Sequence, residues 1–386
     1  MTRIIFVTLV DLSGTSGQNL YSREVANSLN ELEGCSLEII CPYPKREKTE
    51  LLSSDNISVH YLSKKRRQDP KWNLRIQPEI INHLQKIHRT KPIDGIVTPL
   101  KPGLVSPPLF SYWYDIPQIL LVEGMLEKNI AKMSPFPGAT AIAKGIVKIN
   151  AMNSTQAFAA YDEARDMIRS RSGFANTPTE TFHHGVDTDQ FRPIPRQKAR
   201  AQIDAEFRDD DFVIGFVGSF KKYHCVDPLL RAVDSSQKEI KLLLVGEGPE
   251  HEQMESLAKT LDVDAHFTGF VDHETVNTYI SATDAAYGAI DPDHWGSPMK
   301  VFEYLSCERP VIATHSDSLS FVESENLGEI VRTPSQHEVE SALESLHEMS
   351  NEDRVEMGKR GRKYIIENRT WDTLAKKIEE AIKERQ

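Results

Sequence analysis

Residues 285–314, AAYGAIDPDHWGSPMKVFEYLSCERPVIAT, contain the pattern on which the fold prediction depends. The apolar run through Ile290 predicts a buried strand, the polar residues after it a loop, and Pro298 the start of a short helix. The run PVIAT at residues 310–314 predicts a second strand. A helix that begins just after a strand offers free backbone N–H groups and the positive end of its dipole. This strand, loop and helix therefore suit a phosphate group.

Two charged residues follow on the predicted helix. Lys300 adds a positive charge in the first turn, and Glu303 lies three residues later on the same face. A cation for phosphate beside a carboxylate that accepts hydrogen bonds from a ribose diol is what a nucleotide-sugar site requires. The alternative is an ordinary strand–loop–helix of a doubly wound sheet, with a lysine and a glutamate on its surface.

The length and composition are typical of a soluble globular protein. The 386 residues exceed one ordinary core and indicate two or three domains, with 39% hydrophobic and 27% charged residues. No apolar run approaches the roughly 20 residues of a membrane span. The start, MTRIIFVTLVDLSG, indicates a first strand and a glycine turn rather than a signal peptide. Together with four scattered cysteines, these features predict a cytoplasmic protein with reduced thiols.

Strand and helix patterns alternate along the chain and restart after Phe212. The second half contains the apolar runs FVIGFVGSF, IKLLLVGEG, DAHFTGFV, DAAYGAI and PVIAT, each followed by a loop and a helical pattern. Such alternation predicts two α/β domains, each a Rossmann-like doubly wound parallel sheet, with ligands at the carboxyl ends of the strands in the cleft between them. We expect domains at residues 1–192 and 193–368 and an amphipathic helix at residues 369–386.

The net charge of −11 is unevenly distributed. Residues 1–190 contain 22 basic and 20 acidic residues, whereas residues 191–386 contain 24 and 37. Residues 64–91 alone contain nine basic and two acidic residues, with Trp72 and Ile76 between them. This run is either a solvated face or a surface that meets anionic lipid headgroups or a phosphate-bearing acceptor. Nucleic acid is disfavoured because the rest of the chain is acidic and has no recognition motif.

The order of the motifs resembles that of the family-4 retaining glycosyltransferases, which have two Rossmann-like domains in the arrangement called GT-B. In that family two glutamates eight positions apart flank a glycine-containing loop. This chain keeps only the second, Glu303, and has Trp295 at the first position. The other matching segments are GVD at residues 185–187, GSFKKYHC at residues 218–225, VGEG at residues 245–248 and FTGFV at residues 267–271.

The resemblance implies transfer of a sugar, with retention of configuration, from a nucleotide-diphosphate donor to a glycan, lipid-linked or small-molecule acceptor. It implies that no cofactor is needed, that the first domain holds the acceptor, and that the last helix crosses back to that domain. Lysines would stabilise the leaving diphosphate, and Glu123 stands near where relatives have a histidine. The expected catalytic residues are Lys222, Lys300, Glu303 and Glu123. The expected donor-binding residues are Gly14, Gly17, Ser219, Lys222, His224, Gly246, Phe270, Val271, Gly296, Ser297, Pro298, Met299, Lys300 and Glu303.

Alternatives to this interpretation stay open. Asp291 and Asp293 have the spacing of a metal site in the other large glycosyltransferase fold, but the lysines indicate neutralisation of phosphate without a metal. We therefore interpret both as loop carboxylates, one of which could contact sugar hydroxyls. A sugar-nucleotide epimerase of the same fold would need acid–base pairs around the sugar. A non-catalytic two-lobed sugar-binding protein would have no reason to cluster lysines at a phosphate site.

Overall fold

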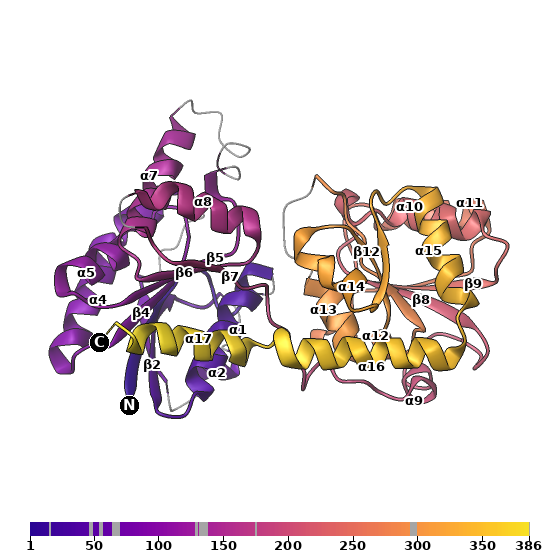
Figure 1. Cartoon of the computed structure of the whole chain (residues 1–386), viewed down its shortest axis with the longest axis horizontal. Coiled ribbons are helices and arrows are strands. Elements are labelled where there is room, and N and C mark those ends of the chain that lie inside the picture. The colour runs from indigo at the N-terminus through magenta and orange to yellow at the C-terminus, as the bar shows by residue number, and fades with distance from the viewer. Residues whose placement is uncertain are drawn as a thin grey trace. The chain divides into compact units, whose positions relative to one another are not determined.

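The computed structural model divides the chain into two compact units, each built on one sheet (Figure 1). Unit 1 comprises Met1–His184 and Trp371–Gln386, and unit 2 comprises Gly185–Thr370. The expected boundary after residue 192 falls inside unit 2. The structure describes residues 1–14, 17–45, 49–53, 57–63, 70–127, 130, 138–173, 176–293 and 299–385.

The sheet of unit 1 is parallel throughout, in the order β3-β2-β1-β4-β5-β6-β7. The order reverses between β1 and β4, where Phe6 pairs with Val97, so this sheet is doubly wound. Its strands β1, β4 and β5 at the centre of the sheet are short and fully buried, as expected for strands covered on both faces. The strands are β1 (Thr2–Val7), β2 (Cys35–Pro42), β3 (Ser58–Leu62), β4 (Gly95–Pro99), β5 (Gln118–Val122), β6 (Gln156–Ala159) and β7 (Thr179–Thr181).

Helices of unit 1 come from both ends of the chain. The last helix, α17, packs against α1 and β5 and buries Leu374, Ile378 and Ile382 on one face. Gly95 makes room for it, because a Cβ there would lie 2.4 Å from the side chain of Ile382. The helices are α1 (Gly17–Glu31), α2 (Glu50–Ser53), α3 (Pro70–Arg75), α4 (Gln77–Thr90), α5 (Ser106–Tyr114), α7 (Ala139–Met152), α8 (Asp162–Ser172) and α17 (Trp371–Lys383).

The basic segment 64–91 contributes apolar side chains to the core of unit 1. Trp72 and Ile76, which lie within the basic segment 64–91, are not available to a partner, because both are buried in the core beneath α3 and α4. Their spacing of four residues places them on one helical face, so they pack together against the sheet. The basic residues of α4 lie around this buried stripe. Residues 64–69, which carry the densest charge, lie outside the described residues.

The sheet of unit 2 is also parallel, in the order β10-β9-β8-β11-β12-β13, and reverses between β8 and β11. The strands are β8 (Phe212–Val217), β9 (Ile240–Val245), β10 (Ala265–Gly269), β11 (Ala285–Tyr287), β12 (Val311–Thr314) and β13 (Gly328–Val331). The helices are α9 (Arg196–Arg200), α10 (Val226–Ser235), α11 (His251–Leu261), α12 (Val276–Ser281), α13 (Met299–Ser306), α14 (Ser320–Ser324), α15 (Gln336–Glu348) and α16 (Asn351–Asn368). Short 3-10 turns are η2 (Lys222–His224), η3 (His273–Thr275) and η4 (Asp317–Leu319).

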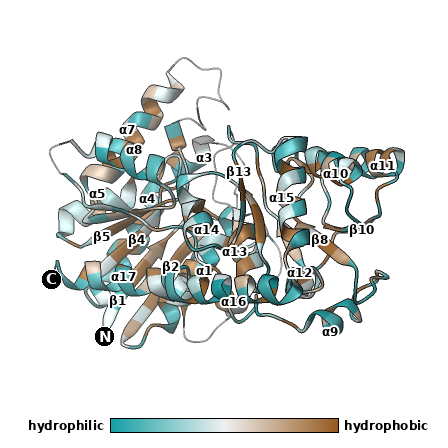
Figure 2. Cartoon of the chain, turned by 45° about the vertical axis from the view of Figure 1, so that its right-hand side comes forward, coloured by the Kyte–Doolittle hydropathy of each residue, from teal (hydrophilic) through white to brown (hydrophobic). Residues whose placement is uncertain are grey.

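Strands form the hydrophobic centre of each unit, and the outer faces of helices such as α16 are hydrophilic (Figure 2). The prediction of two Rossmann-like doubly wound α/β domains is confirmed. The predicted strand through Ile290 is shorter than expected and ends at Tyr287, and β13 was not predicted. Within the described ranges, no helix is both long and apolar enough to cross a bilayer.

Candidate active site

Three loops meet at the carboxyl ends of β8, β9 and β10, beside the point where the strand order of unit 2 reverses. The N–H of Gly218 donates to Val245 O and that of Gly246 to Gly269 O, both at 2.9 Å. Both Gly218 (φ +157°) and Gly246 (φ +121°) have backbone conformations that side chains disfavour. A Cβ on Gly246 would also lie 2.2 Å from Gly218 O. These glycines therefore let the loop backbones pack together at the mouth of the sheet.

The turn between β8 and α10 carries three of the expected donor-binding residues. His224 is buried against Phe216, with ring centroids 5.7 Å apart, and its Nδ1–H donates to the carbonyl of Ser219. Lys222 is exposed at the start of η2. Cys225 has φ +50°, the left-handed conformation that usually favours glycine.

Tyr304 fixes α13 to the end of β8. Its hydroxyl accepts a hydrogen bond from Val217 N–H at 2.8 Å and donates to Val217 O at 3.2 Å. The ring is fully buried, and its burial raises the pKa of the phenol far above the ordinary value. This double hydrogen bond determines where the residues one turn earlier in α13 lie, Lys300 among them.

Lys300 holds a buried ammonium group. Its Nζ lies 4.5 Å from the centre of the Phe216 ring, and a Cβ on Gly218 would be 2.8 Å from the same atom. Nζ is inaccessible to water and has no hydrogen-bond partner among the described residues. Burial therefore lowers the pKa of Lys300 from 10.5 to about 7, although Glu303 opposes the change. An anion placed here would supply the missing counter-charge.

Glu303 lies on the same helix, and the two side chains form no ion pair within the described part of the chain. Burial raises the pKa of the Glu303 carboxyl from 4.5 to about 7, and the charge of Lys300 only partly offsets it. The structure therefore places an acid and a base with displaced pKa values beside one another at the switch point of the sheet. Such pairs are characteristic of functional sites.

The other expected donor-site residues are distributed as follows. Phe270 follows β10 and is 71% exposed, and Val271 after it is partly buried. Met299 is the first residue of α13. Gly296, Ser297 and Pro298, with Trp295, lie outside the described residues. Gly14 and Gly17 belong to unit 1, where Gly14 lies in the turn after β1, with its N–H donating to Asp11 O at 3.0 Å, and Gly17 begins α1.

Asp291 and Asp293 form a local turn in which Asp293 N–H donates to the Asp291 carboxylate at 2.9 Å. This turn accounts for their spacing without an ion. Within the described ranges, no group of three or more His, Cys, Asp or Glu side chains is arranged to hold a metal.

Unit 1 contains a buried polar cluster at the carboxyl ends of β4 and β5. Glu123 follows β5 and pairs with Lys101, which follows β4, at 3.0 Å. Burial raises the pKa of Glu123, while the charge of Lys101 opposes the change. Sequence reasoning identified Glu123 but missed Lys101, although both directly follow apolar strand patterns. Parallel strands end at the same edge of a sheet, and this rule could have paired them.

Two aromatic residues extend this cluster. His184 is buried edge-to-face against Tyr21, with ring centroids 4.8 Å apart, and its Nδ1 has no partner among the described residues. Burial, together with the neighbouring charges of His183 and Lys101, lowers the pKa of His184 to about 3. The ring is therefore neutral at physiological pH. Tyr21 also contacts Trp371 at the start of α17, so the last helix helps to enclose the cluster.

Part of the sequence of unit 2 matches a known family model. Residues 197–364 match the model of the family described as glycosyl transferases group 1. All the residues around Lys300 described above lie within this match.

Particular relatives can then be named. The GDP-mannose-dependent alpha-(1-6)-phosphatidylinositol monomannoside mannosyltransferase of Mycobacterium tuberculosis is 30% identical over 227 residues, 54% of this chain and 58% of the relative. The aligned part thus spans little more than half of that relative. Two solved structures resemble the whole chain. Sucrose-phosphate synthase from Thermosynechococcus elongatus gives a TM-score of 0.75 at 17% identity, covering 100% of this chain and 99% of that one. Anabaena HepE in complex with UDP gives 0.77 at 16% identity, covering 99% and 100%.

We predict that Lys300→Met stabilises the ligand-free protein at about pH 6 by about 1–3 kcal/mol, the usual cost of a buried polar group without a partner. At that pH Glu303 is largely protonated, because its pKa is about 7, so the substitution leaves no new charge unpaired. The folded pKa of Lys300 is lowered, so its cost is largest below pH 7 and disappears as the pH rises toward 10.5. The gain should therefore shrink at higher pH.

Urea unfolding at several pH values would measure this effect. Lys221→Met, at an exposed lysine of the neighbouring turn, is the matched control and should change stability by less than about 0.5 kcal/mol. A loss of stability for Lys300→Met at about pH 6 would mean that the ammonium is paired in the free protein.

Proposed function

We propose that this protein is a retaining glycosyltransferase that moves a sugar from a nucleotide-diphosphate donor to an acceptor, without a metal or other cofactor. The single observation that carries the proposal is the buried, unpartnered ammonium of Lys300 beside Glu303, at the switch point of a sheet whose sequence matches the group 1 family. The named relatives support a nucleotide-sugar donor, since one is GDP-mannose-dependent and another was solved with UDP.

In this proposal the donor diphosphate supplies the counter-charge that Lys300 lacks. Lys222, exposed on the neighbouring turn, and the backbone N–H groups at the start of α13 add positive potential where the diphosphate departs. Glu303 accepts hydrogen bonds from the ribose hydroxyls, and its ionisation becomes easier once the diphosphate has fixed the positive charge of Lys300. Gly246, Phe270 and Val271 border the nucleotide, with Phe270 free to contact the base.

Unit 1 would hold the acceptor at the carboxyl ends of its strands. Gly14, in the segment between β1 and α1, and Gly17, the first residue of α1, would let the backbone approach the substrate. Glu123 is held by Lys101 at 3.0 Å, so its carboxylate has a fixed direction. We assign Glu123 to orienting an acceptor hydroxyl, and burial raises the pKa of its carboxyl group.

The exterior of unit 1 supports the proposal of a lipid-linked acceptor and a membrane surface. Exposed apolar side chains gather on three helices, where a lone water-soluble unit would normally bury or scatter them. Helix α7 also carries Lys144 and Lys148 and no acidic residue. Tyrosine and tryptophan favour the headgroup level of a bilayer, and lysines favour anionic lipids. The exposed residues are Leu74 on α3, Tyr112, Trp113 and Tyr114 on α5, and Ile142, Ile149 and Met152 on α7.

Turnover is the direct test of the proposed function. Incubation with UDP-, GDP- and ADP-sugars should release free nucleoside diphosphate from one donor even without acceptor, and nuclear magnetic resonance of the transferred sugar should show the donor's anomeric configuration. EDTA should leave the rate unchanged, because positive charge from lysines replaces a metal. Loss of turnover in EDTA that magnesium or manganese restores would contradict metal independence. An inverted product would contradict retention.

Glu303→Gln should weaken nucleoside diphosphate binding by about tenfold or more, which corresponds to roughly 1.4 kcal/mol per decade. The amide keeps the shape but loses the charge that strengthens hydrogen bonds from the ribose. Calorimetric titration of both proteins with the nucleoside diphosphate of the active donor measures the effect. Glu274→Gln, at an exposed glutamate of η3, serves as the control. Equal affinities for the protein and its Glu303→Gln variant would mean that Glu303 does not bind the ribose.

The protein should sediment with anionic but not with neutral liposomes at low salt, because each basic residue near an anionic leaflet contributes on the order of 1 kcal/mol. Trp113→Ala and Lys148→Glu should each reduce the bound fraction. Lys359→Glu, at an exposed lysine of α16 in unit 2, should not. Equal recovery in the supernatant with both lipid compositions would remove the membrane proposal and leave sugar transfer untouched.

A further inference from the structure

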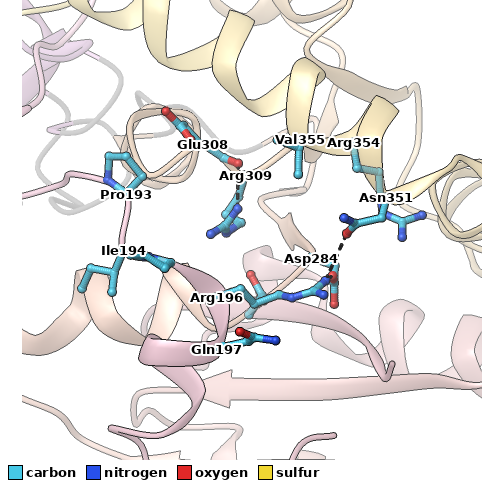
Figure 3. Close-up of a pocket in the computed structure, with 12 residues that line it drawn as sticks. Pro193, Ile194, Arg196, Gln197, Asp284, Glu308, Arg309, Asn351, Arg354 and Val355 are labelled. Carbon is cyan, nitrogen blue, oxygen red and sulfur yellow. Dashed lines mark hydrogen bonds and ion pairs between the residues drawn. The ribbon is translucent and has the colours of Figure 1, made fainter. Parts of the chain in front are cut away.

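Unit 2 contains a cavity at the amino ends of its strands, the edge of the sheet opposite the one that carries Lys300 (Figure 3). Its volume is about 500 Å³. The walls come from the start of α9, the residues just before β11 and β12, and the first turn of α16. The cavity is therefore separate from the candidate donor site, although the same unit contains both.

Positive charge is concentrated around this cavity. Three arginines line it, Arg196, Arg309 and Arg354, and Figure 3 shows Arg309 and Arg196 projecting toward its centre. Asp284 and Glu308 are the acidic residues of the wall. Asp284 is already shared between Arg196 and the buried Arg200, the latter at 2.9 Å. The wall therefore carries more arginines than carboxylates. Residues 191–386 as a whole show the opposite balance, with more acidic than basic residues.

The backbone holds two of these guanidinium groups, those of Arg309 and Arg354, in place without neutralising them. Arg309 donates to Ser281 O and Glu308 O, both at 3.0 Å, and Arg354 donates to Leu346 O at 2.9 Å. Carbonyl groups orient an arginine but bring no full negative charge. Arginine side chains fixed in this way lose little further freedom when they bind a ligand.

Two donors of these arginines are left unused. The Nε atoms of Arg309 and Arg354 are buried and have no partner within the described part of the chain. A buried N–H without an acceptor is costly, so both arginines are incompletely satisfied in the free protein. Burial also lowers the pKa of both guanidinium groups, which indicates positive charge that the neighbouring carboxylates do not fully compensate.

We propose that this cavity binds a small molecule that carries a phosphate group. Paired N–H groups of a guanidinium match the oxygens of a phosphate, and charge-assisted hydrogen bonds of this kind are stronger than neutral ones. The volume exceeds that of a bare phosphate ion, and Pro193, Ile194 and Val355 give an apolar wall for a carbon skeleton. A hexose phosphate has both parts. Such a ligand would contact both residues 193–197, which precede the first strand of the unit 2 sheet, and α16, the last helix of that unit.

Thermal unfolding can test this proposal with glucose 6-phosphate, mannose 6-phosphate and inorganic phosphate as probes. Each titration is run with and without a saturating nucleoside diphosphate, so that binding at the donor site is recognised by competition. We expect a sugar phosphate to raise the unfolding midpoint in both series, because a ligand that binds only the folded state stabilises it. No shift at millimolar concentration, a shift matched by sodium chloride at equal ionic strength, or a shift abolished by the nucleotide would each overturn the proposal.

Variants at an exposed residue of the cavity wall locate the binding without disturbing the arginines. Val355→Glu places a negative charge in the wall and should weaken sugar phosphate binding by at least tenfold, whereas Val355→Gln, which has the same shape, should weaken it much less. Arg309→Gln should also weaken it by at least tenfold. Equal affinities for the glutamate and glutamine variants would overturn the assignment. Nucleoside diphosphate binding should be the same in all three variants, so failure here is distinguishable from failure of the donor-site proposal.

Discussion

The hydrogen bonds between Tyr304 and Val217 constrain the geometry of the candidate donor site more than any other contact. They join α13 to the end of β8 at a point where the backbones of Gly218 and Gly246 leave no space for a side chain. A lysine usually extends its ammonium into water while its stem packs on apolar surface. Here the helix is fixed too close to the strand for that, so Lys300 ends over the ring of Phe216.

The buried ammonium of Lys300, which has no partner in the described part of the chain, lowers the stability of the free protein, and an anionic ligand at the candidate site would offset that loss. Lys300 and Glu303 are of opposite charge, yet burial moves both of their pKa values toward neutrality, which means that their attraction does not compensate for lost hydration. Natural proteins tolerate such local conflicts mainly where function requires them. The cluster of Lys101 and Glu123 in unit 1 differs, because there the two charges are in direct contact.

Local pattern was enough to predict much of the fold and part of the site. Lys300 and Glu303 share a helix face because of their spacing, and apolar runs correctly indicated β8 to β12. The segment GEIV of β13 was missed because a glycine and a glutamate weaken its pattern. The burial of Trp72 and Ile76 was not predicted, because both stand within a run of charged residues. The arginine cavity and the partners of Glu123 depend on residues far apart in sequence, which no local pattern brings together.

The position of α17 has a consequence for how the polypeptide folds as it is made. Translation delivers the chain from its amino end, but unit 1 includes Trp371–Gln386, and α17 covers α1 and β5. Until the ribosome releases these last residues, the apolar surface that Leu374, Ile378 and Ile382 will bury stays open. Unit 2 is an unbroken stretch of sequence and has no such requirement. Unit 2 is synthesised after most of unit 1, but all of its residues are available for folding before those of unit 1 are.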